Sequence, residues 1–255
     1  MIQLYLGDCL EVMKGIPDKS VDLTFTSPPF KEKDVEGEYW EEYDKWFTEI
    51  SRITSKVICI IHSATKLNYL ISKYPPKRTL IWGKGFSQYS WRFNPILVYQ
   101  ISDDYKINKF IYSDAFGVQP VSSKSESRTH IYQDPEILYK AVIRMFKGCD
   151  TVFDPFMGSG TTGVTSILEN RSFMGCEIDP TYFAIAEKRI KYAKQKMRLT
   201  VLVNSTFARL TCYSASCGST CRCSRTTPSS LCTRWSGAYT GNCCSRITFS
   251  RCVTR

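Results

Sequence analysis

The stretch 151-TVFDPFMGSGTTG-163 decides the fold class of this chain. An apolar strand-like run ends at Asp154, and a loop with glycines at 158 and 160 leads into a helical pattern that starts near Thr161. Glycines allow backbone amides to approach a ligand closely, and the start of the helix points its positive end at that ligand. The stretch therefore predicts the first half of a nucleotide-binding βαβ unit.

A second apolar run, 173-FMGC-176, ends in Glu177, 17 residues after Gly160. An acidic residue at this place in a βαβ unit accepts hydrogen bonds from ribose hydroxyls, which indicates a nucleoside-containing cofactor. The loop lacks the lysine of a phosphate-binding P-loop, so a polyphosphate is disfavoured, and Asp154 could instead face an ammonium group. The predicted cofactor contacts of this unit are Asp154, Phe156, Gly158, Ser159, Gly160, Thr161 and Glu177.

The residues Ser27-Pro28-Pro29-Phe30 follow directly on the strand-like run 21-VDLTFT-26. Two prolines fix φ and remove two backbone donors, so carbonyl groups and the Ser27 hydroxyl are left as acceptors at the carboxyl end of the strand. Such a loop suits the N–H groups of a nucleobase amine, and Phe30 offers a flat face for an extruded base. A simple surface turn is the alternative for this segment taken alone.

Taken together, these segments resemble the β group of amino-group DNA methyltransferases, which use S-adenosylmethionine. TSPPF resembles the catalytic motif, DPFMGSGTTG resembles the cofactor motif, and 7-GDCL-10 resembles the opening segment in which Asp8, followed by Cys9, meets the adenine of the cofactor. In this group the catalytic motif comes first, whereas protein-glutamine and most RNA methyltransferases have the opposite order. The resemblance covers about residues 1 to 198 and implies an α/β fold, a doubly wound Rossmann-like sheet with helices on both faces.

The resemblance implies direct in-line methyl transfer to an exocyclic amine of double-stranded DNA after base flipping. The lone pair of such an amine is delocalised, so Ser27 Oγ and the Pro28 carbonyl would have to orient it by accepting its N–H bonds. Ser27 is typical of N4-cytosine methylation, with N6-adenine methylation as the alternative. A catalytically weak DNA-binding relative is the alternative of another class. No Pro-Cys pair occurs, which disfavours a covalent cysteine mechanism.

The net charge of +10 comes from the end of the chain, because residues 188 to 255 hold 13 Lys plus Arg and no acid. The stretch from Ile50 to Ser102 also lacks acids and has eight basic residues. Within it, ordinary solvation accounts for Arg52 and Lys56. The predicted DNA contacts lie in an aromatic loop after 78-RTLIW-82, for which hairpin packing is the alternative: Lys84, Trp91, Arg92 and Phe93.

The remaining pattern predicts further strands over 2–6, 57–61 and 95–100 and helices over 9–14, 67–74 and 135–147. Residues 103–134 are polar and lack a strong period, and they form the short candidate target-recognition insertion. His130, Gln133 and Pro135 resemble a segment that helps to hold the methionine part of the cofactor. Asp134 stands there in place of the more usual lysine or small residue.

Two domains are expected, a catalytic domain over 1–199 and a tail over 200–255. The tail holds eight of the 12 cysteines and shows no sustained period, so it is predicted to be irregular. It contains neither His nor an acid and repeats no CxxC pair, which argues against a metal site. It fits out-of-frame translation or a disordered basic segment that binds DNA nonspecifically.

No run of about 18 apolar residues and no signal-peptide pattern is present in this sequence, so a cytoplasmic protein without a membrane span is expected. The resemblance further implies a restriction endonuclease as the partner in a restriction-modification system.

Overall fold

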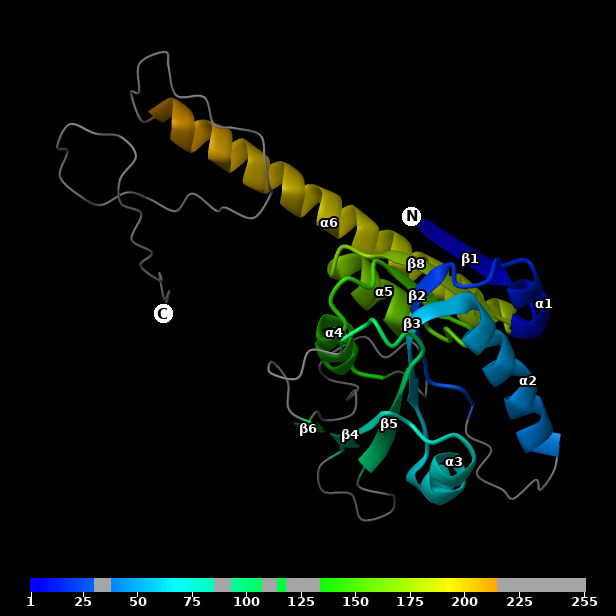
Figure 1. The fold of residues 1–255 in the computed structure, drawn as a ribbon. Helices are drawn as coiled ribbons and strands as arrows, with labels where there is room; N and C mark the ends of the chain where they lie inside the picture. The colour runs from blue at the N-terminus through cyan, green and yellow to red at the C-terminus, as the bar shows by residue number, and fades with distance from the viewer. Residues whose placement is uncertain (30–37, 85–92, 107–113, 118–133, 215–255) are drawn as a thin grey trace. The chain divides into compact units, whose positions relative to one another are not determined.

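The structure is a computed structural model that describes residues 1–29, 38–84, 93–106, 114–117 and 134–214, with side chains described as far as residue 199. Figure 1 shows the chain as a ribbon. The strands are β1 (Ile2–Leu6), β2 (Val21–Thr26), β3 (Thr54–Ile61), β4 (Arg78–Gly83), β5 (Phe93–Gln100), β6 (Ala115–Gly117), β7 (Thr151–Asp154) and β8 (Ser172–Glu177). The helices are α1 (Cys9–Lys14), α2 (Glu38–Ile53), the 3-10 turn η1 (Ala64–Lys66), α3 (Leu67–Lys73), α4 (Glu136–Met145), α5 (Thr161–Leu168) and α6 (Pro180–Ser214).

The eight strands form one sheet in the order β1-β8-β7-β2-β3-β5-β4-β6. The pairs β1–β8, β8–β7, β7–β2 and β2–β3 are parallel, and β5 runs antiparallel to both β3 and β4. The direction in which successive strands are added reverses between β7 and β2. Doubly wound sheets bind their ligands at such a reversal. Leu23 pairs with Val152 and Thr24 with Phe153. The loop after β2 and the loop after β7 therefore leave the same edge of the sheet as neighbours.

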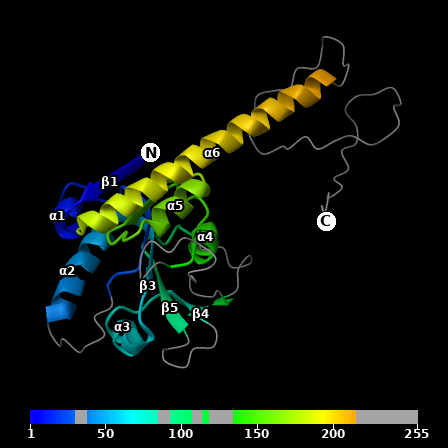
Figure 2. The ribbon, with the colours of Figure 1, turned by 180° about the vertical axis from the view of Figure 1, so that it is seen from behind.

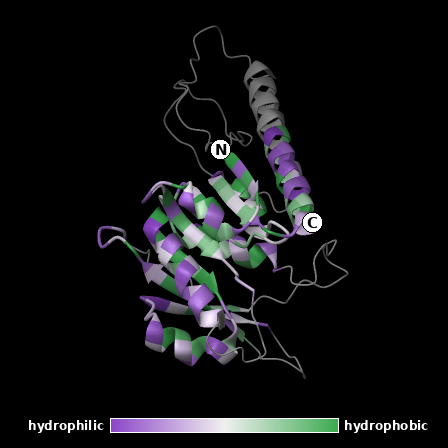
Figure 3. Cartoon of the chain, turned by 90° about the vertical axis from the view of Figure 1, so that its right-hand side faces the viewer, coloured by the Kyte–Doolittle hydropathy of each residue, from purple (hydrophilic) through white to green (hydrophobic). Residues whose placement is uncertain are grey.

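Helices cover both faces of the sheet, as predicted (Figures 1 and 2). On one face, α4, α5 and α6 contribute Val142, Val164 and Ile190 to a core with Leu23 and Phe25 of β2. On the other face, α1, α2 and α3 pack Met13, Tyr43, Leu70 and other apolar residues against Ile58, Ile60 and Phe153. Figure 3 shows the apolar residues of the strands between helices of mixed hydropathy. The doubly wound α/β fold expected from the sequence is confirmed.

Glycines allow α6 to approach α5 closely. A Cβ built on Gly163 would lie 2.4 Å from Ile190 Cδ1, and one on Gly160 would lie 2.9 Å from Ala186 Cβ. Gly160 also has φ +82°, a left-handed conformation that side chains disfavour. Gly160 therefore serves both the loop conformation and the close packing of α6, and Gly163 serves that packing.

The structure differs from the sequence expectations in three places. Phe93 is the first residue of β5 and pairs with Gly83, so it does not belong to the predicted aromatic loop. The short strand β6 lies inside the interval expected to lack structure, because three residues are too few to show a period. Helix α6 continues to Ser214, past the predicted start of the irregular tail, since the sequence from Pro180 to that point contains neither a glycine nor a second proline to end it.

The chain forms two compact units, one from Met1 to Met197 and one from Arg198 to Arg255. In the second unit, side chains are described only for its first two residues. Across the part of the chain that the structure describes, no helix combines the length and the hydrophobicity that a bilayer crossing requires.

Candidate active site

Asp154, the last residue of β7, joins the two motif segments. Its side chain is 2% exposed, and Oδ1 accepts hydrogen bonds from Thr26 Oγ1 at 2.6 Å and from the Phe156 amide at 3.0 Å, while Oδ2 accepts one from Thr162 Oγ1. Thr26 directly precedes Ser27, and Thr162 lies in the first turn of α5. One buried carboxylate thus fixes the loop after β2 to the loop after β7.

Burial and, to a smaller extent, the negative charge of Glu177 raise the pKa of Asp154 to about 6, although the hydrogen bonds from Thr162, Thr26 and Phe156 lower it. No ion pair to Asp154 occurs among the described residues. The carboxyl edge of the sheet therefore holds two anions near one another without a directly bound cation.

Glu177, the last residue of β8, closes the other side of this region. Oε2 accepts the Gly158 amide at 2.9 Å, and Oε1 accepts the Asp179 amide at 2.9 Å. The side chain therefore holds the glycine loop against the end of β8, while each carboxylate oxygen keeps capacity for a second donor. Ile178 directly follows and is 66% exposed, an apolar side chain left beside an acidic one.

Arg189 of α6 clamps the glycine loop through hydrogen bonds. Its Nη1 donates to the Ser159 carbonyl at 2.7 Å and to Ser159 Oγ at 2.9 Å, with a longer contact of 3.4 Å to Thr161 Oγ1. Its Nη2 donates to Glu136 Oε1 of α4 at 2.8 Å. The clamp uses one partly buried guanidinium to tie α4, α6 and the loop together.

Ser27 and Pro28 begin the loop after β2, with Ser27 partly buried, Pro28 buried and Pro29 exposed; Phe30 lies outside the described residues. The Ser27 hydroxyl lies close to Asp134 and Tyr139, and it lowers the pKa of both groups. Asp134 and Tyr139 belong to the start of α4 and the residues just before it. The structure thus brings a third segment to the same edge.

Asp8 and Cys9 reach this edge through β1. Leu6 pairs with Glu177, and the Gly7 amide donates to the Glu177 carbonyl at 3.0 Å. Asp8 is the N-cap of α1, where Oδ1 accepts the Leu10 amide at 2.7 Å. Burial raises the pKa of the Cys9 thiol to about 12, so this cysteine is not a thiolate nucleophile at neutral pH.

The predicted DNA contacts are only partly described. Lys84 follows β4, and its Nζ lies 5.0 Å from the centroid of the Trp82 ring, while its charge lowers the pKa of Asp134. Phe93 is partly buried at the start of β5. Trp91 and Arg92 lie outside the described residues. Lys84 thus lies near the group of residues around Ser27.

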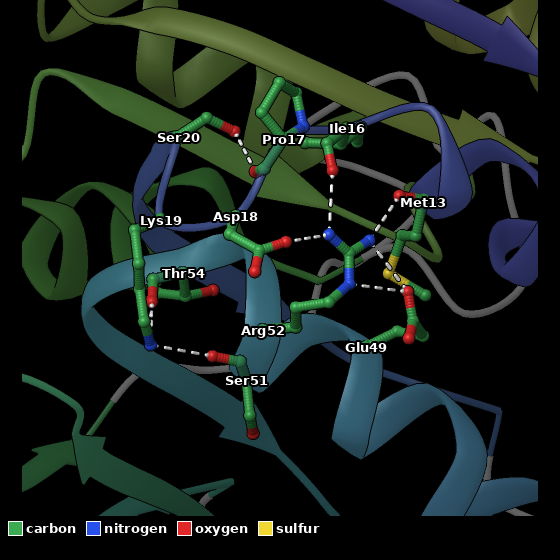
Figure 4. A network of polar contacts seen from close by, with 10 residues as sticks. All are labelled: Met13, Ile16, Pro17, Asp18, Lys19, Ser20, Glu49, Ser51, Arg52 and Thr54. Carbon is green, nitrogen blue, oxygen red and sulfur yellow. Dashed lines mark hydrogen bonds and ion pairs between the residues drawn. The ribbon is translucent and has the colours of Figure 1, made fainter.

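Arg52 and Lys56, which the sequence predicts to be ordinary solvated side chains, instead make internal contacts. Figure 4 shows that the Arg52 guanidinium donates to the carbonyls of Met13 and Ile16 and pairs with Asp18 and Glu49. Lys56 Nζ pairs with Asp22 at 2.7 Å and donates to the Gly148 carbonyl at 2.6 Å.

Sequence reasoning missed four residues of this region as site residues. Tyr139 and Arg189 sit in amphipathic helices, where their positions resemble those of ordinary core and surface residues. Asp134 was noted only as a departure from the family pattern. Nothing in the sequence separates Ile178 from other apolar residues, because singly exposed apolar side chains are common.

Comparisons with known proteins agree with this arrangement. A family model described as DNA methylase, of the N6/N4 methyltransferase type, matches residues 77–188. The Type II methyltransferase M.HinfI of Haemophilus influenzae is 25% identical, over 74% of this chain and 68% of its own length. Over residues 77–188, this chain is therefore similar to the DNA methylase family.

Solved structures support the fold of this chain. The PvuII DNA methyltransferase (cytosine-N4-specific) superposes with a TM-score of 0.63 and 18% identity, covering 74% of this chain and 86% of that one. The complex of M1.HpyAVI with SAM superposes with a TM-score of 0.59 and 24% identity, covering 74% and 99%. Both support the same doubly wound arrangement for this chain.

Proposed function

We propose that this DNA methylase transfers a methyl group from S-adenosylmethionine to the exocyclic N4 amine of cytosine in double-stranded DNA, after the base is flipped out of the helix. One observation carries the proposal: the pairing of β2 with β7 and the hydrogen bond from Thr26 to Asp154 set the Ser27 loop beside the glycine loop. An acceptor-rich loop and a nucleotide-type loop at one sheet edge are the two parts that such a transfer needs.

The chemistry of the carboxyl edge fits the cofactor. When bound, S-adenosylmethionine supplies an electrophilic methyl group on a cationic sulfonium. The raised pKa of Asp154, caused by burial and by the nearby Glu177, indicates an edge that a cation would stabilise. Because Asp154 is buried among its own donors, it would act on a cation through its charge, without direct contact.

The cofactor contacts follow from the same edge. Glu177 would accept ribose hydroxyls with its remaining lone pairs, and Asp8 and Cys9 would border the adenine together with the exposed Ile178. The loop would contribute Phe156 and the backbone of Gly158, Ser159, Gly160 and Thr161, held in place by Arg189.

The catalytic loop would hold the target amine. Ser27 Oγ and the Pro28 carbonyl would accept its two N–H groups and aim the nitrogen lone pair at the methyl group, with Pro29 fixing the loop and Phe30 stacking on the base. Ser27 in place of an acidic residue favours cytosine N4 over adenine N6. The family description covers both amines, so N6-adenine methylation stays the second candidate.

The duplex would approach this edge across Lys84, Trp91, Arg92 and Phe93, with residues 103–134 as the target-recognition segment. The catalytic domain would comprise residues 1–199 and the tail residues 200–255. By analogy with its Type II relatives, the enzyme would act beside a restriction endonuclease in the cytoplasm.

Two measurements on the same reaction test the proposal. Purified protein is incubated with tritiated S-adenosylmethionine and duplex DNA of mixed sequence, and the DNA is then digested to nucleosides for mass spectrometry. We expect label in DNA and N4-methylcytosine as the product. Methylated adenine would select the second candidate, and cofactor binding without label in DNA would favour a binding-only relative.

A further inference from the structure

Asp134 is anchored to the catalytic strand by a tyrosine. Tyr139 Oη donates to Asp134 Oδ2 at 2.8 Å, and the Tyr139 ring lies 4.6 Å from the ring of Phe25, centroid to centroid. Phe25 belongs to β2 and lies two residues before Ser27. Tyr139 is only 4% exposed, so this bridge between α4 and β2 is part of the core.

Three groups face the Asp134 carboxylate, and each favours its charged form. The Tyr139 phenol, the Lys84 ammonium and the Ser27 hydroxyl all lower its pKa, yet burial outweighs them and raises the pKa to about 6. The charges of Asp134 and Asp154 in turn raise the pKa of Tyr139, so the phenol stays protonated and keeps donating. A carboxylate with a pKa near neutrality suits the acceptance of a proton at physiological pH.

Other candidates for a proton acceptor at this edge are occupied. Asp154 holds two hydroxyls and one amide, and Glu177 holds two backbone amides. His62 is buried, with Nδ1 accepting the Ser63 amide at 2.8 Å and Nε2 lying 3.0 Å from Tyr39 Oη. Among the described residues, Asp134 is the partly buried carboxylate that neighbours the Ser27 hydroxyl.

We infer that Asp134 is the catalytic proton acceptor of this methylase, taking the proton that the target amine must lose, either directly or through the Ser27 hydroxyl. The inference rests on the proposed function. The amine nitrogen forms a bond to the methyl carbon while the carbon–sulfur bond breaks and its electron pair stays on sulfur. The nitrogen then carries a positive charge and two protons, one of which passes to the Asp134 carboxylate. The resulting carboxylic acid returns that proton to water.

The test compares wild type with Asp134→Asn, Tyr139→Phe and the control Asp150→Asn, which neutralises an exposed carboxylate at the amino end of the sheet. Single-turnover rates of methyl transfer to duplex DNA are measured from pH 5 to 9, and affinity for S-adenosylmethionine is measured by calorimetry. The wild-type rate should fall below about pH 6, because a protonated Asp134 cannot accept a proton. Asp134→Asn should lower the rate by about 10²-fold or more and abolish this acid limb, with cofactor affinity unchanged.

Tyr139→Phe sharpens the test, because it removes a bond that favours the charged carboxylate. Its acid limb should move to higher pH, while Asp150→Asn should match wild type. A second readout is the carboxyl carbon NMR signal of aspartate-labelled protein without cofactor. The signals of Asp134 and Asp154 should both titrate near pH 6; one of the two should vanish in Asp134→Asn, and the same one should titrate at higher pH in Tyr139→Phe.

An active wild type whose rate and acid limb survive Asp134→Asn would overturn the inference and leave the proposed function intact. A wild type that binds the cofactor but transfers no methyl group would overturn both. Equal losses of rate and cofactor affinity in Asp134→Asn would assign Asp134 a structural part only.

Discussion

The carboxylates at the two ends of the central sheet have different partners and opposite pKa shifts. At the amino end, Asp22 accepts the amides of Asp150 and Thr151 and pairs with Lys56. Burial opposes these contacts, but together they hold the pKa of Asp22 below its usual value. At the carboxyl end, Asp154 has hydroxyl and amide partners only, and its pKa is raised to about 6.

The difference distinguishes the end that holds the fold together from the end that is built for a ligand. Arg52 (Figure 4) and Lys56 direct their donors at protein acceptors near the amino end, so these charges are balanced internally. Asp154, Glu177 and Asp134 gather at the carboxyl end, where two of the three have raised pKa values. An excess of negative charge there costs stability in the free protein and favours a cationic ligand.

The largest effect should come from replacing Asp154 by Asn and following the free energy of unfolding against pH. The folded pKa of about 6 exceeds the unfolded value near 3.8, so the contribution of Asp154 is most favourable below pH 3.8 and is lost as the pH rises through 6. The free energy of unfolding of Asp154→Asn, taken relative to that of wild type, should therefore rise by up to about 3 kcal/mol between pH 4 and pH 8. Denaturant titrations at each pH measure this difference.

Asp22→Asn is the matched control, with the opposite sign. Because the folded pKa of Asp22 is lowered, its stabilising contribution is present at neutral pH and is lost on acidification through that lowered pKa. The variant should therefore be less stable than wild type at pH 7 and approach it at low pH. If the stabilities of Asp22→Asn and Asp154→Asn changed in the same direction with pH, the proposed difference between the two ends of the sheet would be contradicted.

Glu177→Ala should weaken binding of S-adenosylmethionine by about 1.5 to 3 kcal/mol, because it removes a charge-assisted contact to the ribose and releases Gly158. Calorimetry measures this loss. Glu49→Ala, at the amino end, removes a carboxylate that is also engaged internally and should leave cofactor affinity unchanged. Retention of full affinity by Glu177→Ala would remove Glu177 from the cofactor site.

Arg189→Met and Arg52→Met compare the two internal arginines. Each should lower the free energy of unfolding by about 1 to 2 kcal/mol through the loss of several hydrogen bonds. Only Arg189→Met should also weaken cofactor binding, by about 1 kcal/mol, since only Arg189 holds the Ser159 loop. Arg189→Lys should recover part of that affinity. Equal cofactor affinities in the two methionine variants would mean that the clamp does not serve the site.

Removal of residues 200–255 should have the smallest effect. The contact-defined unit from Met1 to Met197 contains the whole sheet and the candidate site, so folding, cofactor affinity and most activity should remain. Thermal unfolding and the transfer assay check this expectation. A truncated protein that precipitates or loses its cooperative transition would show that the tail contributes to the catalytic unit.

Local patterns were sufficient to predict several elements to the residue. The bounds of β1, α1 and β2 match the prediction because each is a short periodic run with a turn residue or a cap at its end, such as Asp8 before α1. The motif loops were also found, since glycine and proline mark them. What the sequence did not reveal was the set of partners across the sheet.

Those partners depend on contacts between residues far apart in the chain. Thr26 meets Asp154 across 128 positions, and Arg189 meets Glu136 across 53. No local signal distinguishes Thr26 from any other strand threonine, and Tyr139 resembles an ordinary core aromatic on an amphipathic helix. The balance between burial and hydrogen bonding that sets the pKa of Asp134 likewise exists only after the fold has formed.

The central claim is that the Ser27 loop grips the amine while a separate loop holds the methyl donor. It is tested most directly by measuring single-turnover methyl transfer and S-adenosylmethionine affinity for Ser27→Ala beside wild type. We predict a transfer rate lower by about 10² to 10³-fold with cofactor affinity within twofold of wild type. An unchanged rate, or parallel losses of rate and affinity, would contradict the account.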